Sequence, residues 1–178
     1  MSPENQNTQV SSPGSSVAEL FAGYKGGEDM PLAGYATLLG IYNAAFAALL
    51  LTAKNSGRHL PERVSYADLV LLGLATHKIS RIIAKDRVTS PLRAPFTEYE
   101  EPAGESEVKE KVRGQGLQRA IGDLVTCHWC LGAWVAAGLT FGLVFRPRTT
   151  RIIGTVFAAV VVSDFLNYAQ EAAKEKSR

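Results

Sequence analysis

The chain has 178 residues, a formal net charge of +2 at pH 7 and two cysteines. Two cysteines exclude a disulfide framework, and the basic residues do not gather into one arm of the kind that binds nucleic acid. The mean hydropathy is near zero, at +0.01, because polar segments alternate with long uncharged runs. We therefore expect an all-α integral membrane protein with three or four transmembrane helices and a disordered N-terminal tail.

The N-terminal part is the most polar. Residues 1–30 begin with a stretch rich in Ser, Asn, Gln and Pro, which predicts a disordered tail. Residues 17–24 could form a short helix on the membrane surface, and a disordered tether is the alternative. Residues 31–170 are expected to form the membrane helical domain, and residues 171–178 a charged tail.

Four segments are candidate spans. Residues 31–53 are 23 residues without a charge, about the number that crosses a bilayer core as a helix. Residues 64–85 carry a basic stripe on their second half and are expected to span, although an amphipathic helix in the interface is the alternative. The other two segments, residues 124–145 and 152–169, are apolar over most of their length and are joined by a short arginine-rich turn.

The segment between the second and third spans, residues 86–117, is polar. Pro91 and Pro95 favour an extended or turning backbone at its start, and mixed acids and bases follow. We expect a solvated loop or a surface helix here. In the third span, Gly138 and Gly142 form a G-x-x-x-G pattern, which predicts a helix-packing face.

Four spanning helices would alternate between the two sides of the membrane. The end of the second, the start of the third and the end of the fourth would then share one leaflet. This places basic and acidic groups together, and we predict that Lys78 or Arg81 pairs with Asp123 or Asp164, because unpaired charges in apolar surroundings are costly. The alternative is that these groups lie at the interface and face water.

Lys and Arg near the span ends indicate the orientation. The side of the polar connection and the two termini carries 11 of them, and the other side carries the remaining six: Lys54, Arg58, Arg63, Arg146, Arg148 and Arg151. This excess favours a multi-pass membrane protein with both termini in the cytoplasm.

The most chemically suggestive motif is Cys127-His128-Trp129-Cys130. Residues three apart share one face of a helix, so the two sulfurs can meet a common partner. One reading is thiol–disulfide exchange, because a helix N-terminus and a neighbouring imidazolium favour thiolate. A second is zinc binding, for which His77 or a second subunit would complete the ligand set. The third is plain packing of two small apolar side chains.

Two stretches carry a family resemblance. They are R-x-x-x-x-D-x-x-T-S-P-L-R-x-P-F, here Arg81 to Phe96, and L-x-x-C-x-x-C-x-G-x-W, here Leu124 to Trp134. Together they resemble an uncharacterised bacterial membrane-protein family of unknown function (DUF 1360), some members of which are labelled sporulation proteins. The resemblance covers about residues 65–169 and implies that the C-x-x-C and the connection after the second span form one functional region. The signature residues of that connection are Asp86, Thr89, Ser90, Pro91, Leu92, Arg93, Pro95 and Phe96.

The sequence thus favours a membrane protein of the bacterial cell envelope with an interaction or scaffolding role and no identifiable catalysis. The alternative is a membrane thiol-redox or metal-binding protein that acts through Cys127 and Cys130. Under either function, the expected partners of the chain are the lipid bilayer, anionic headgroups, a protein that the sequence does not identify and a second copy of the chain. Nucleic acid is not expected as a partner. No cofactor is predicted firmly, and zinc is the candidate.

Overall fold

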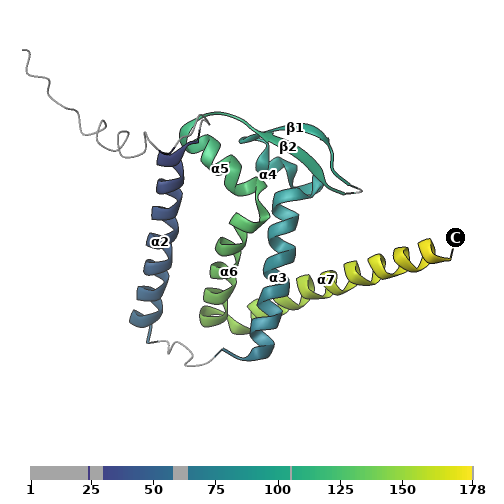
Figure 1. Ribbon diagram of the computed structural model, residues 1–178. Coiled ribbons are helices and arrows are strands. Elements are labelled where there is room, and N and C mark those ends of the chain that lie inside the picture. Colours follow the sequence, from purple (N-terminus) through teal and green to yellow (C-terminus); the bar gives the residue numbers. More distant parts are fainter. Residues whose placement is uncertain (1–23, 25–29, 58–63, 105, 178) are drawn as a thin grey trace, which may run out of the picture.

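Four long helices dominate the computed structural model, which describes residues 24, 30–57, 64–104 and 106–177. They are α2 (Leu32–Asn55), α3 (Tyr66–Lys85), α6 (His128–Phe145) and α7 (Pro147–Lys176). Figure 1 shows α2, α6 and α3 side by side, whereas α7 starts beside α3 and then extends away from the other helices. The predicted disordered tail and the surface helix at 17–24 lie outside the described residues, apart from Tyr24 and Met30.

The shorter elements gather at one end of the upright helices, where α3 ends and α6 begins (Figure 1). They are η1 (Arg87–Thr89), α4 (Ser90–Arg93), β1 (Thr97–Pro102), β2 (Val108–Val112) and α5 (Gly116–Thr126). The strands β1 and β2 form an antiparallel hairpin. The fold is therefore mostly helical rather than all-α, and the expectation of a loop or surface helix at 86–117 is wrong over the hairpin.

Oppositely charged residues face each other across the two strands, and this explains why the segment forms a hairpin. Acidic residues of β1 face basic residues of β2, with Glu98 opposite Lys111 and Glu101 opposite Lys109. Opposite charges directly across an antiparallel pair stabilise it, and the same residues in a single helix would leave those pairs apart. The mixed charges that suggest a solvated loop in the sequence therefore belong to two paired strands, with acidic residues on β1 opposite basic residues on β2.

Three of the described helices, α2, α6 and α7, are long and apolar enough to cross a membrane. Their outward faces expose large apolar side chains, such as Leu39 and Leu51 on α2 and Ile152 and Phe165 on α7. Soluble proteins rarely leave so much contiguous apolar surface in water. α3 is of similar length, with 20 residues, but it carries four charged side chains.

The helix ends differ from the predicted spans. The third predicted span, 124–145, is divided between α5 and α6, because the backbone is extended at Cys127 with φ −102° and ψ 100°. The fourth, 152–169, lies inside the longer α7, whose helix continues through the charged tail to Lys176. The first and second predicted spans, 31–53 and 64–85, correspond to α2 and α3.

Small residues set the packing of α7 against α3. Thr150, Gly154, Ala158 and Val161 are buried on one face of α7, and Gly154 lies against the side chain of Leu71. Small side chains let two helices approach closely in lipid. Of the two predicted packing glycines, Gly142 lies close to Thr150, but Gly138 has no neighbouring atom within 4 Å of where a Cβ would lie.

α2 contacts α5 closely through Gly34. A Cβ at this position would lie 2.7 Å from the Ala120 Cβ and 2.9 Å from the Gly116 carbonyl oxygen. One residue later, the Tyr35 hydroxyl donates a hydrogen bond to Asp123 at 2.7 Å. The start of α2 is therefore fixed on α5 by shape and by one polar contact.

This contact predicts that Gly34→Ala destabilises the protein, by about 1–3 kcal/mol, because α2 and α5 must separate to admit a methyl group. Gly40→Ala is the matched control on the same helix, where a Cβ meets nothing within 4 Å. Thermal unfolding in detergent micelles, followed by tryptophan fluorescence, measures both, since Trp134 lies 5.1 Å from the ring of Tyr42 on α2. Equal stability of the two variants would contradict the close packing.

Candidate functional site

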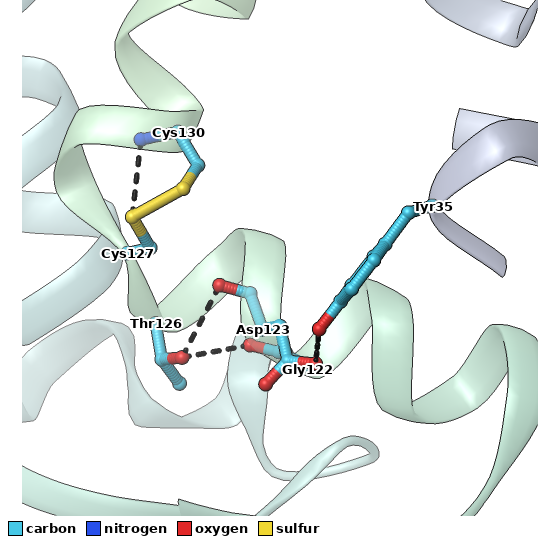
Figure 2. Close-up of a disulfide and its surroundings, with 6 residues drawn as sticks. All are labelled: Tyr35, Gly122, Asp123, Thr126, Cys127 and Cys130. Carbon is cyan, nitrogen blue, oxygen red and sulfur yellow. Dashed lines mark hydrogen bonds between the residues drawn. A yellow bond between two sulfur atoms is a disulfide. The ribbon is translucent and has the colours of Figure 1, made fainter. Parts of the chain in front are cut away.

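A disulfide closes the first turn of α6. Cys127 and Cys130 are bonded to each other, and Cys127 is the residue that caps the helix (Figure 2). The Cys127 Sγ accepts a hydrogen bond from the backbone N–H of Cys130 at 3.2 Å. The first N–H groups of a helix have no partner within it, so the sulfur satisfies one of them. Cys130 is exposed, whereas Cys127 is half-buried.

The bend before this turn has local causes. α5 ends at Thr126, whose hydroxyl donates to the Gly122 carbonyl oxygen at 2.8 Å (Figure 2). Cys127 then takes an extended conformation, and its carbonyl oxygen accepts the first bond of α6 from Leu131 at 3.0 Å. The cysteine pair therefore lies at the junction of two helices and not inside one.

Aromatic and basic groups surround the pair. Trp129 is 82% exposed, and its ring centroid lies 4.9 Å from that of His128. His77, Arg81 and Lys85 on α3 are close enough to His128 to act on it electrostatically. The basic stripe of α3 thus faces the start of α6, which carries the positive end of the helix dipole.

At the end of α3, the Arg93 side chain lies completely buried. Its Nε donates to Glu110 of β2 at 2.6 Å, and its Nη1 donates to the Ile83 carbonyl oxygen at 2.6 Å. Its Nη2 donates to the Asp86 carbonyl oxygen at 2.9 Å. The last carbonyls of a helix have no partner within it, so Arg93 both ends α3 and joins it to the hairpin.

Hydroxyl groups complete this network. The Thr89 hydroxyl donates to the Ile82 carbonyl oxygen at 2.5 Å and accepts from Arg93 at 2.8 Å. The Ser90 hydroxyl also accepts from Arg93, at 3.2 Å. The buried Thr97 hydroxyl donates to the Arg93 carbonyl oxygen at 3.0 Å. The polar groups of the Asp86–Arg93 stretch therefore bind α3 and the hairpin.

The other signature residues have simpler positions. Pro91 lies in the first turn of α4, where its fixed φ fits and its missing N–H costs nothing. Leu92 and Pro95 are exposed side chains. The carbonyl oxygen of Pro95 accepts from Gln118, and that of Phe96 accepts from the backbone N–H of Arg113.

The four residues expected to form ion pairs do not all meet one another. Lys78 Nζ contacts Asp164 of α7 at 2.9 Å, and the Lys78 side chain is largely buried. Arg81 instead contacts Glu107 at 2.6 Å, and Asp123 accepts from Tyr35. A further pair that the sequence analysis missed joins Asp68 of α3 to Arg151 of α7 at 2.8 Å.

Glu107, Glu110 and Thr97 were also missed. They lie in or beside the hairpin, and a segment expected to be a solvated loop gives no reason to pair its acids with upstream arginines. The alternation of V-K-E-K-V is the signal that could have indicated a strand, with Glu110 at its centre.

The expected zinc site has no preformed cage in the described part of the chain. No group of three or more His, Cys, Asp or Glu side chains is placed there to hold a metal ion. The two sulfurs are bonded to each other, so zinc would require their reduction and a further ligand. Zinc binding therefore stays a prediction.

Removing Arg93 is expected to cost the most stability in this region. Arg93→Met leaves Glu110, whose side chain is 6% exposed, as an unpaired buried charge, which costs about 3–5 kcal/mol. The matched control is Arg113→Met, because Arg113 makes one exposed hydrogen bond to the Ala94 carbonyl oxygen. Limited proteolysis of the hairpin in lipid nanodiscs, together with thermal unfolding, compares the two. A hairpin equally protected in both variants would contradict the role of Arg93.

The carboxyl groups of Asp86 and Glu101 predict opposite changes of protein stability with pH. Burial raises the pKa of Asp86 above its ordinary 3.8, so the folded protein holds this proton more tightly than the unfolded chain. The stabilisation of the folded protein that protonated Asp86 contributes is complete below pH 3.8. It is lost as the pH rises through the pKa that Asp86 has in the folded protein. The hydrogen bond from Lys109 lowers the pKa of Glu101 below its ordinary 4.5, so its contribution is present above pH 4.5 and is lost as the pH falls.

We therefore expect Asp86→Asn to gain stability relative to the wild type as the pH rises from 3.8. Glu101→Gln should lose stability above pH 4.5 and match the wild type in stronger acid. Thermal unfolding of the three proteins between pH 3 and pH 7 measures the differences. Differences of the same sign for both variants would contradict these assignments.

Residues 71–170 match the model of a family described as "Protein of unknown function (DUF1360)". Sporulation protein YjcA of Bacillus subtilis (strain 168) is 36% identical over 86 residues, which cover 47% of this chain and 73% of that protein. UPF0713 protein YngL of the same organism is 28% identical over 88 residues, which cover 49% of this chain and 65% of that protein. No solved structure matches. The matched region contains both signature stretches and confirms the resemblance, and the chain belongs to the DUF1360 family.

Proposed function

We propose that this chain is an integral membrane protein of the bacterial cell envelope that carries out thiol–disulfide exchange at one membrane surface through Cys127 and Cys130. The observation that carries the proposal is the disulfide in the first turn of an apolar helix of 18 residues. Such a helix is about 27 Å long and fits a bilayer core of about 30 Å. The disulfide then lies at the membrane–water boundary, where a partner can reach it.

Two features support the membrane assignment. α3, which carries four charged side chains, packs against α6 and α7, and two of its charges pair with α7 through Asp68–Arg151 and Lys78–Asp164. Paired charges inside a bundle are tolerated at membrane depth. Trp129 at the start of α6 suits the interface, where exposed tryptophan is enriched.

The proposed orientation bears directly on the disulfide. The excess of Lys and Arg on the side of the polar connection favours a cytoplasmic position for this end of the bundle. Cytosolic disulfides in most bacteria are transient and belong to catalytic or redox-sensing proteins. A cytoplasmic Cys127–Cys130 bond is therefore one that forms and breaks during function, and not a permanent structural link.

The exchange requires a protein dithiol as its co-reactant, and its atoms and electrons then balance. A thiolate of the partner attacks one sulfur of the pair, the S–S bond breaks, and the other sulfur leaves as a thiolate. The partner's second thiolate then attacks the mixed disulfide and releases a disulfide in the partner. This chain is left as a dithiol with two more electrons, and a partner disulfide reverses the sequence.

The test is the redox equilibrium of the full chain in nanodiscs. The protein is equilibrated with glutathione buffers of different potential, quenched with acid, and alkylated with a bulky maleimide that shifts its gel mobility. We expect a reversible transition within the cellular range, about −180 to −320 mV. The variant with both cysteines replaced by serine is the control. A pair that stays oxidised below this range, or that does not reoxidise, would reject exchange as the function.

An interaction role is the second candidate, and the Arg93 network favours it. The network holds a polar unit of α4, β1 and β2 rigidly against the end of α3, and the outward residues of the strands are exposed. A rigid, charged surface suits contacts with a protein or with anionic headgroups, which attract nearby Lys and Arg by about 1 kcal/mol each. Cysteine-to-serine variants that keep full function in cells would favour this role, and zinc bound to the reduced protein would favour a metal site.

A further inference from the structure

The two sulfurs of the disulfide differ in their surroundings. Cys130 is exposed at the surface of α6, whereas Cys127 is half-buried at the junction of α5 and α6. Within the described part of the chain, Cys127 is the one of the two that receives a backbone hydrogen bond at its sulfur, from the N–H of Cys130 at 3.2 Å. An exchange reaction distinguishes these two sulfurs, because one must be reached by the incoming thiolate and the other must leave.

We propose that an incoming protein thiolate attacks the Sγ of Cys130 and that Cys127 leaves as the thiolate. The assignment rests on the thiol–disulfide exchange proposed above. The mixed disulfide then joins Cys130 to the partner until the partner's second thiolate releases it. In the reverse direction, when Cys130 has attacked a partner disulfide, Cys127 is the sulfur that displaces the partner and restores the internal bond.

Access favours attack at Cys130. The attacking sulfur must approach along the line of the S–S bond, from the side of the sulfur it attacks. The neighbour of Cys130 in the chain is Trp129, which projects into the surroundings and contacts only the His128 ring among the described aromatic residues. At Cys127, the backbone leaves α5 and enters α6, so both helices limit the approach.

Charge favours departure of Cys127. The leaving sulfur carries a negative charge, and at Cys127 this charge meets the Cys130 N–H and the positive end of the α6 dipole. A thiolate stabilised in this way is the better leaving group. At Cys130, one turn into the helix, the sulfur receives no backbone hydrogen bond.

The experiment uses the oxidised wild-type chain in nanodiscs and a limiting amount of glutathione. The reaction is stopped with acid after short times, free thiols are alkylated with N-ethylmaleimide, and fragment spectra locate the two labels. We expect glutathione on Cys130 and N-ethylmaleimide on Cys127, in about tenfold excess or more over the reverse pattern. The reverse pattern, or equal amounts of both, would overturn the assignment while leaving exchange itself intact.

Single variants give a second readout that does not depend on trapping. The alkylation rate of the thiol in Cys130→Ser, which retains Cys127, should rise at a lower pH than that of the thiol in Cys127→Ser. The same pH dependence for the two thiols would contradict the stabilised leaving group. A wild-type chain that forms no mixed disulfide at all would instead reject the proposed exchange function together with this inference.

Discussion

The buried guanidinium of Arg93 is the interaction on which this end of the protein depends. It satisfies carbonyl oxygens at the end of α3 and pairs with Glu110 in the middle of β2. An arginine can do this because its five N–H groups fan out in one plane, whereas lysine offers a point charge. Without this side chain, Glu110 would be left buried and unpaired, and the hairpin would lose its buried link to the end of α3. With it, the hairpin and α5 form a fixed layer over the start of α6.

This layer explains why the cysteine pair lies where it does. α5 follows β2 directly and packs against it at Gly122, where a Cβ would overlap Val112 and approach the Phe96 carbonyl oxygen at 2.9 Å. α5 is also fixed at its other face by Gly34 and Tyr35 of α2. α5, fixed on both faces, ends at Thr126, and the chain bends at the extended residue Cys127 before α6 begins. The bend places one cysteine at the cap and the other in the first turn, which is the asymmetry that the proposed chemistry uses.

The sequence predicts the long helices better than the layer at their end. Long apolar runs identify α2, α6 and α7, because length and apolarity need no information about neighbours. The alternation V-K-E-K-V is a local signal for β2, but the Arg93 network depends on contacts such as Arg93–Glu110, which join residues 17 positions apart and leave no periodic trace. Of the Gly138–Gly142 pattern, Gly142 lies against Thr150 of α7, but the contact between α7 and α3 uses Gly154, which no such motif marks. The C-x-x-C motif indicates where the proposed chemistry lies, and the bend distinguishes its two sulfurs.

The central claim is that Cys127 and Cys130 form a redox-active pair on the cytoplasmic side of a membrane, and thiol labelling in living cells tests it most directly. A membrane-impermeant maleimide is applied to intact cells, with and without prior reduction, and again to lysed cells after acid trapping of the redox state. Our proposal predicts labelling only after lysis, with part of the chain trapped as the dithiol and part as the disulfide. Labelling of intact cells that requires prior reduction, with the whole chain trapped as the disulfide, would place a permanent structural bond outside the cell and contradict the proposal.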